Sequence, residues 1–235
     1  MNYLNLVLVF VLSYLVGSIP FGLIIVKTFT GKDVREVGSG RTGGTNAMRA
    51  AGLAAGVLTA LGDILKGLVS GWLAEVLLPG EPLVKVIAVL LAIIGHNYSI
   101  FLIKRNNAGK LALEGGAGGA TAFGGALALW PPIWMFLLPL LMLVYLLVGF
   151  ASVMTLSVGF FCIIIFAITA NMGITPPVYT LYGVGTLILT AIALRPNLKR
   201  LKNGTERSVG LRRYLEKKRE AKSSSHDEQV KPPSS

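Results

Sequence analysis

The chain is poor in charge, in histidine and in cysteine. Of its 235 residues only 14% are charged, and the two histidines are His96 and His226. A soluble domain carries about 25% charged residues, so the composition excludes an ordinary water-soluble globule and a disordered chain. The single cysteine, Cys162, excludes an intrachain disulfide and a zinc site built on paired cysteines. With so few ligating side chains, we expect no metal ion.

Hydrophobic residues are instead abundant, at 53% of the chain. Crossing about 30 Å of hydrocarbon takes about 20 apolar residues, and seven stretches meet or approach that length, Gly119–Trp130 only marginally. The sequence therefore predicts an all-α integral membrane protein with about seven transmembrane helices. The expected spans are Leu4–Val26, Leu53–Leu78, Leu83–Ile103, Gly119–Trp130, Ile133–Phe150, Ser152–Ala170 and Val178–Leu194.

Three of these spans contain residues that are unusual in a membrane helix. Pro20 falls inside the first, where its missing N–H predicts a bend or break. Asp63 and Lys66 lie one turn apart in the second, and charged groups at membrane depth normally pair or face a cavity. We interpret them as a structural ion pair. His96, near the end of the third span, is more typical of a hydrogen-bonded core histidine than of an acid or base.

Lysine and arginine are distributed unevenly between the two sides that seven spans define. Most of the 22 cations fall in the first loop, the third loop and the segment from Arg195 onward. This asymmetry predicts a cytoplasmic C-terminus and an outside N-terminus. We expect residues 1–206 to form the membrane domain and residues 207–235 a tail that is basic and then rich in serine and proline. Because a basic segment beside a membrane attracts anionic lipids, the net charge of +11 predicts contact with membrane lipids and no nucleic acid.

Three polar segments lie on the predicted cytoplasmic side, and the first is Gly38–Gly52. Its glycines allow backbone N–H groups to surround an anion. Thr42 or Thr45 could cap a helix that runs into the second span, and the N-terminus of that helix would add positive potential. Asn46 and Arg49 would share one face of this helix, where the arginine fork suits a phosphate or carboxylate. The alternative is a flexible loop with a solvated arginine.

The second and third polar segments are Glu114–Thr121 and Arg195–Glu206. The glycines of the second could also expose backbone donors to an oxyanion. However, Gly115 and Gly119 have the GxxxG spacing of close helix packing in lipid, which is the favoured interpretation of that segment taken alone. For the third segment, the simplest interpretation is a basic helix on the membrane surface that ends at Gly204.

Across these segments the chain resembles the small bacterial integral-membrane glycerol-3-phosphate acyltransferases that use acyl phosphate as the donor. The family pattern GSGNxGATNxxRxxG corresponds to Gly38–Gly52, and Asp-x-Leu-Lys-Gly corresponds to Asp63–Gly67. The remaining blocks keep the family order. They are Gly17–Pro20 for the Gly-Ser-Ile block, Gly95–Phe101 and Gly115–Thr121 for the two parts of GHxxPxFxxFKGGKGVAT, and Asn197–Glu206 for the part of RHxxNIxRLxxGxE that begins at its asparagine.

The resemblance implies a multi-pass, monomeric enzyme of the bacterial cell membrane, with its active site on the cytoplasmic face. It would transfer a fatty acyl group from acyl phosphate to the 1-hydroxyl of glycerol 3-phosphate, giving lysophosphatidate and phosphate for phospholipid biosynthesis, without coenzyme A, a metal ion or another cofactor. By position, Ser39, Arg49 and Asn197 would be its catalytic residues. Asp63, Lys66, His96 and Glu206 would support the site, and Thr45, Asn46, Gly115, Gly116, Gly118, Gly119 and Arg195 would bind substrate.

Several positions depart from the family pattern. Arg41 stands where the family has asparagine, and the two lysines of the glycine block fall on Glu114 and Ala117. The histidine before the final asparagine falls on Leu194, unless a gap brings Arg195 into its place. These changes leave open a non-catalytic relative that binds anionic lipid or a phosphorylated metabolite. A transporter of small anions is a further alternative, although most spans lack the polar groups that it would need.

Overall fold

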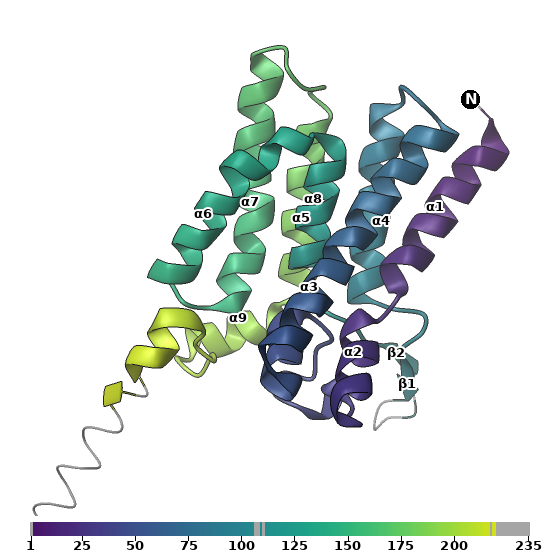
Figure 1. The fold of residues 1–235 in the computed structure, drawn as a ribbon. Helices are drawn as coiled ribbons and strands as arrows, with labels where there is room; N and C mark the ends of the chain where they lie inside the picture. Colours follow the sequence, from purple (N-terminus) through teal and green to yellow (C-terminus); the bar gives the residue numbers. More distant parts are fainter. Residues whose placement is uncertain (1, 106–108, 110, 217, 220–235) are drawn as a thin grey trace, which may run out of the picture.

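The computed structural model describes residues 2–105, 109, 111–216 and 218–219. They form a bundle of helices with a small β-hairpin at one end (Figure 1). In chain order the elements are α1 (Tyr3–Ser18), α2 (Phe21–Thr30), the 3₁₀ turn η1 (Val34–Glu36), α3 (Gly44–Leu77), α4 (Pro82–Asn97), β1 (Ile103–Arg105), β2 (Leu111–Leu113), α5 (Gly119–Leu129), η2 (Pro131–Ile133), α6 (Trp134–Leu147), α7 (Ala151–Asn171), α8 (Tyr179–Ala193) and α9 (Arg195–Lys202).

The outer surface of the bundle is apolar, while part of its interior is polar. Trp72, Phe136 and Leu147 are more than half exposed, whereas Thr59 and Thr186 are fully buried. A water-soluble protein rarely exposes so much contiguous apolar surface. Lipid is the solvent that suits this surface, and hydrogen bonds inside the helices satisfy the backbone there. The protein is therefore a helical membrane protein.

Three described helices are long and apolar enough to cross a membrane: Tyr3–Thr30 taken across its break, Gly44–Leu77 and Ala151–Asn171. The pair α8 and α9, bent by 71°, would make a fourth. The other apolar helices have 10–17 residues: Pro82–Asn97, Gly119–Leu129 and Pro131–Leu147. The number of seven spans and the sides on which the termini lie therefore stay predictions.

The first two spans agree with the sequence prediction. The break at Pro20 is confirmed, because α1 ends at Ser18 and Pro20 precedes α2. The second predicted span, Leu53–Leu78, corresponds to the part of α3 that follows Gly52, and the helix expected to run into it from the first polar segment is present. α3 starts at Gly44 and continues through Gly52, which has a φ of 87° that glycine adopts without steric cost. The polar start of α3 and its apolar part therefore meet at a kink.

The third predicted span, Leu83–Ile103, is wrong at its C-terminal end, because α4 ends at Asn97. Beyond this point the Ser99 hydroxyl donates to the Ser18 carbonyl, and the Ser99 N–H donates to the Glu114 carbonyl. These bonds turn the chain away from the helix and into the antiparallel hairpin of β1 and β2. The hairpin is the exception to the all-α prediction.

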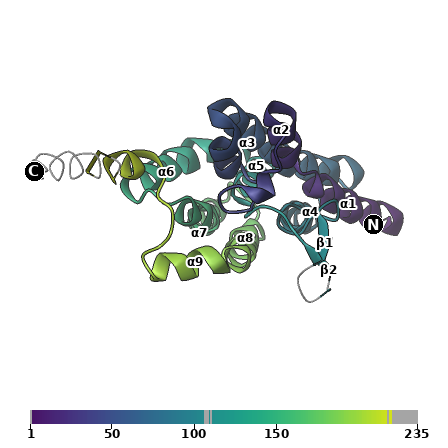
Figure 2. The same ribbon diagram turned by 90° about the horizontal axis from the view of Figure 1, so that it is seen from below.

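Helix α5 lies inside the bundle, against α3, α4, α7 and α8 (Figures 1 and 2). A Cβ atom on Gly124 would overlap the Ile64 carbonyl oxygen, so the backbones of α5 and α3 are in contact. Small residues in α5 thus serve close packing. With 11 residues, α5 rises only about 16 Å and is too short to cross the hydrocarbon layer by itself.

The chain after α9 returns to the turn between α6 and α7. Ser208 forms a β-bridge with Phe150, Val209 is buried, and the Arg212 guanidinium lies 4.4 Å from the centre of the Phe150 ring. The first part of the predicted tail, 207–235, therefore packs on the membrane domain. The serine- and proline-rich end of that tail, 223–235, lies outside the described residues.

Candidate functional site

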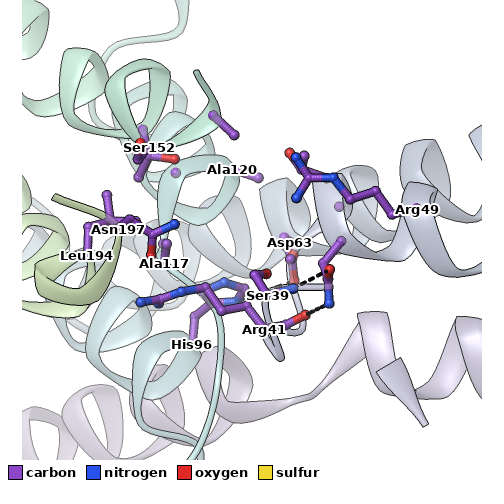
Figure 3. A pocket seen from close by; sticks show the side chains of 18 of the residues that line it. Ser39, Arg41, Arg49, Asp63, His96, Ala117, Ala120, Ser152, Leu194 and Asn197 are labelled. Atoms are coloured by element: carbon purple, nitrogen blue, oxygen red, sulfur yellow. Dashed lines mark hydrogen bonds and ion pairs between the residues drawn. The ribbon is translucent and has the colours of Figure 1, made fainter. Parts of the chain in front are cut away.

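The three polar segments of the sequence meet at one end of the bundle, the lower end in Figure 1. Between them lies a cavity with a volume of about 110 Å³, which we call the site cavity (Figure 3). Residues of all three segments line it: Ser39, Arg41, Gly43, Gly44, Thr45, Asn46, Arg49, Ala117, Gly118, Gly119, Ala120, Asn197 and Glu206. The other lining residues are Asp63, His96, Ala151, Ser152, Thr155 and Leu194.

Asn46 holds the first polar segment in shape. Its side-chain nitrogen lies 2.9–3.0 Å from the carbonyl oxygens of Val34, Val37 and Arg41, and its Oδ1 accepts from the Ser39 N–H at 3.0 Å. Both polar atoms of this buried amide are thus occupied by the loop that it closes. Asn46 lines the cavity, but its visible contribution is to fix the backbone around Ser39. Its substrate-binding role stays a prediction.

Helix α3 begins at this loop without a side-chain cap. Gly43 is the residue before its first turn, so the prediction that Thr42 or Thr45 caps the helix is wrong. Thr42 is buried instead, and its N–H donates to the Gly115 carbonyl of the second polar segment at 3.4 Å. The N–H groups of the first turn, at Gly44 and Thr45, therefore remain available to a ligand in the site cavity.

Four helices begin at or beside the site cavity. The first residues of α3, α5 and α7 line it, as does Asn197 of α9, and none of these helices has a side-chain cap. A helix N-terminus carries unpaired N–H groups and roughly half a positive charge. Their convergence makes the cavity electropositive before any side chain is counted, which suits a phosphate group.

The glycine loop, residues 114–118, lies between the site cavity and a second cavity of about 430 Å³. Gly115 and Gly116 line the second cavity, whereas Gly118 and Gly119 line the site cavity. The Gly116 N–H donates to the His96 carbonyl at 2.9 Å and fastens the loop to the end of α4. The glycines of the loop thus line both cavities with their backbone.

Arg41 and Arg49 bring positive charge to the site cavity, and both are partly buried. Within the described part of the chain, neither guanidinium has a carboxylate within 4 Å. Arg41 donates to the carbonyl oxygens of Gly116, at 2.9 Å, and Ala193. Burial and the nearby charge of Arg200 lower the pKa of Arg41, yet a guanidinium stays charged at neutral pH. Partly buried cations without a counter-ion indicate an anionic ligand.

Asn197, in the first turn of α9, contributes a free acceptor. Its Nδ2 donates to Glu206 Oε1 at 2.8 Å, and Glu206 Oε2 accepts from Arg200 Nε at 3.0 Å. Glu206 therefore supports the third segment. Asn197 Oδ1 is buried and has no hydrogen-bond partner among the described residues. Leaving such an acceptor unpaired costs about 1–3 kcal/mol, so its position indicates a ligand that donates, such as a hydroxyl.

Asp63, Lys66 and His96 form a buried charged cluster beneath the cavity. Lys66 Nζ lies 2.9 Å from Asp63 Oδ1, and His96 Nδ1 lies 3.4 Å from the same oxygen and 3.3 Å from Lys66 Nζ. All three side chains are at most 4% exposed. Asp63 and His96 line the site cavity. Lys66 does not line it, and its Nζ lies 5.3 Å from the centre of the Phe21 ring.

Sequence reasoning missed two hydroxyl groups at the start of α7, Ser152 and Thr155. Ser152 Oγ is buried without a partner in the described structure, and Thr155 packs against Gly119 of α5. The sequence signal that could have identified them is the presence of two hydroxyl side chains at the beginning of an apolar span. Arg195 was expected in the site, but it lines the second cavity and not the site cavity. Ser39 lines both.

Comparison with known proteins gives a consistent result. The family model described as glycerol-3-phosphate acyltransferase matches residues 7–204. The glycerol-3-phosphate acyltransferase of Syntrophomonas wolfei is 34% identical over 199 residues, covering 85% of this chain and 94% of that protein. That of a Thermus thermophilus strain is 35% identical over 205 residues, covering 86% and 94%.

The fold is similar to that of solved structures as well. The crystal structure of PlsY, an integral membrane glycerol 3-phosphate acyltransferase, in its glycerol 3-phosphate form superposes with a TM-score of 0.74 at 29% identity. The lysophosphatidic acid form superposes with a TM-score of 0.73 at 27% identity. Each alignment covers 89% of this chain and 98% of the other.

Proposed function

Because the chain belongs to the glycerol-3-phosphate acyltransferase family, we propose that it transfers a fatty acyl group from acyl phosphate to the 1-hydroxyl of glycerol 3-phosphate. In this reaction the hydroxyl oxygen forms an ester bond with the acyl carbon. The bond between that carbon and the phosphate oxygen breaks, and the hydroxyl proton leaves with the phosphate. The products are lysophosphatidate, a precursor of membrane phospholipids, and inorganic phosphate.

The convergence of uncapped helix N-termini, two arginines and a free amide oxygen in one cavity is the observation that carries this proposal. Acyl phosphate is already an activated anhydride, so the protein has to align a hydroxyl with the carbonyl and neutralise two phosphates. None of these tasks needs a protein nucleophile, and we assign none to Ser39.

The geometry suggests a division of roles within the site cavity. Arg49 and the first turn of α3 hold the phosphate of glycerol 3-phosphate, and Asn197 Oδ1 accepts the hydrogen bond of the attacking hydroxyl. Ser39 donates its hydroxyl to a substrate oxygen. The glycine loop holds acyl phosphate, with its phosphate on the side of the second cavity that Gly115 and Gly116 line, and the acyl chain extends into the surrounding lipid. Because the arginine- and lysine-rich segments lie at this end, we place the site on the cytoplasmic face.

The test is product formation by the purified protein in lipid nanodiscs. With radiolabelled glycerol 3-phosphate, palmitoyl phosphate should give lysophosphatidate and inorganic phosphate in equal amounts, and palmitoyl coenzyme A should give neither. No product from palmitoyl phosphate, with glycerol 3-phosphate still bound, would support the non-catalytic alternative. Product from the coenzyme A ester alone would replace the proposed donor.

Arg49→Ala should weaken the interaction with glycerol 3-phosphate by about 1.5–3 kcal/mol, the scale of a hydrogen bond to a charged group. We expect kcat/KM for glycerol 3-phosphate to fall roughly 10- to 100-fold. Lys202→Ala, which removes an exposed cation at the far end of α9, is the matched control and should change it less than twofold. Steady-state kinetics of the two variants decide, and an unchanged kcat/KM in Arg49→Ala would remove this residue from the site.

A further inference from the structure

The second cavity, on the other side of the glycine loop, is large enough for an anion of its own. Its volume is about 430 Å³, whereas a water molecule occupies about 30 Å³ of liquid. It shares Ser39, Arg41 and Asn197 with the site cavity, so the two spaces adjoin. The site cavity, at about 110 Å³, is small for the polar groups of two phosphorylated substrates.

Three guanidinium groups line this second cavity: Arg41, Arg195 and Arg200. Arg41 and Arg200 line the same cavity, and the nearby charge of Arg200 contributes to the lowered pKa of Arg41. Like charges that face one space repel each other, and an anion bound between them offsets this repulsion. Arg41 uses two of its five N–H donors on the carbonyl groups of Gly116 and Ala193, so three remain.

Glu114, the carboxylate that lines this cavity, lies 3.2 Å from Arg35 and 3.9 Å from Lys104. Glu206, which lines the site cavity, accepts from Asn197 and Arg200. Of the three guanidinium groups, Arg200 therefore already has a carboxylate partner. Arg41 and Arg195 have no carboxylate within 4 Å in the described ranges of the chain. The uncapped first turn of α9, which carries Arg195, adds further positive potential.

We propose that the second cavity binds a phosphate group between Arg41, Arg195 and Arg200 while glycerol 3-phosphate occupies the site cavity. The source of this phosphate group, as part of the acyl donor or as the product that acyl transfer releases, rests on the proposed function. Inorganic phosphate, which the acyl transfer releases, and the phosphate of an anionic lipid headgroup share the required chemistry. The cavity gives the released phosphate a place to go that does not overlap the attacking hydroxyl.

Calorimetric titration of inorganic phosphate tests the site without any acyl donor. The full-length protein is placed in phosphatidylcholine nanodiscs and saturated with glycerol 3-phosphate, and one phosphate should still bind. Arg195→Gln should weaken this binding at least tenfold, and Arg41→Gln should do the same. Lys199→Gln, which neutralises an exposed cation one turn further along α9, is the matched control and should change it less than twofold.

Loss of phosphate binding on saturation with glycerol 3-phosphate would overturn the proposal, because one site would then serve both ligands. Unchanged affinity in both arginine variants would overturn it too. Nanodiscs that contain phosphatidylglycerol separate the two sources: equal affinity supports free phosphate, and a tenfold loss shows that a headgroup takes the site. If the protein binds the second phosphate but makes no lysophosphatidate, the phosphate site is supported and only the proposed function is refuted.

Discussion

Asp63→Asn is expected to lower the free energy of unfolding by about 3–5 kcal/mol, the cost of removing one partner of a buried ion pair. Asp63 and Lys66 lie 2.9 Å apart and are each 2% exposed, so the substitution leaves a buried ammonium group without a counter-ion. His96 and the Phe21 ring would compensate only in part. The measurement is unfolding in mixed micelles, followed by circular dichroism.

Lys85→Met provides the control for this prediction. Lys85 pairs with Glu75 at 3.1 Å, but the Glu75 side chain is 51% exposed, so breaking the pair should cost less than about 1 kcal/mol. The double variant Asp63→Asn with Lys66→Met should recover part of the lost stability, because no buried charge is left alone. Equal losses in Asp63→Asn and Lys85→Met would contradict a structural role for the buried cluster.

Gly116→Ala should reduce kcat by about 100-fold. A Cβ atom at this position would overlap His96 Nε2, and His96 is held in turn by Asp63 and Lys66. The glycine loop has to move, which breaks the hydrogen bond from the Gly116 N–H to the His96 carbonyl. A displacement of about 1 Å in a positioning element is enough to cost roughly 100-fold in rate. Single-turnover rates with both substrates saturating would measure it.

Gly80→Ala separates this local effect from a general glycine effect. Gly80 lies in the turn between α3 and α4 and has a φ of 74°, and a Cβ atom added there would meet no other atom within 4 Å. Its alanine variant should lose about 1 kcal/mol of stability through left-handed strain and keep its kcat. Equal loss of activity in both variants would show that the glycine loop does not position the substrates.

Features that depend on local spacing could be predicted from the sequence. The break at Pro20 follows from one missing N–H, and the contact of Asp63 with Lys66 follows from their separation by one helical turn. The three polar segments gather at one end of the bundle because helices that cross it return the loops to the same side. Polar residues could therefore be assigned to one site before their contacts were known.

Features that depend on distant contacts could not be predicted in this way. Arg41 reaches the carbonyl groups of Gly116 and Ala193, which are far away in the chain, and no periodicity encodes such contacts. The end of α4 was misplaced because hydropathy marks apolar length, whereas the turn at Ser99 is fixed by backbone and side-chain hydrogen bonds.

The most direct measurement is cysteine labelling at Ser39, in the middle of the proposed site. Cys162, the chain's single cysteine, is buried in α7 and can be replaced by alanine, so that Ser39→Cys carries the only thiol. A membrane-impermeant maleimide should label this thiol in inverted vesicles and not in intact cells, and glycerol 3-phosphate should slow the labelling. Labelling from the outside, or a rate that glycerol 3-phosphate leaves unchanged, would contradict a cytoplasmic pocket for this substrate.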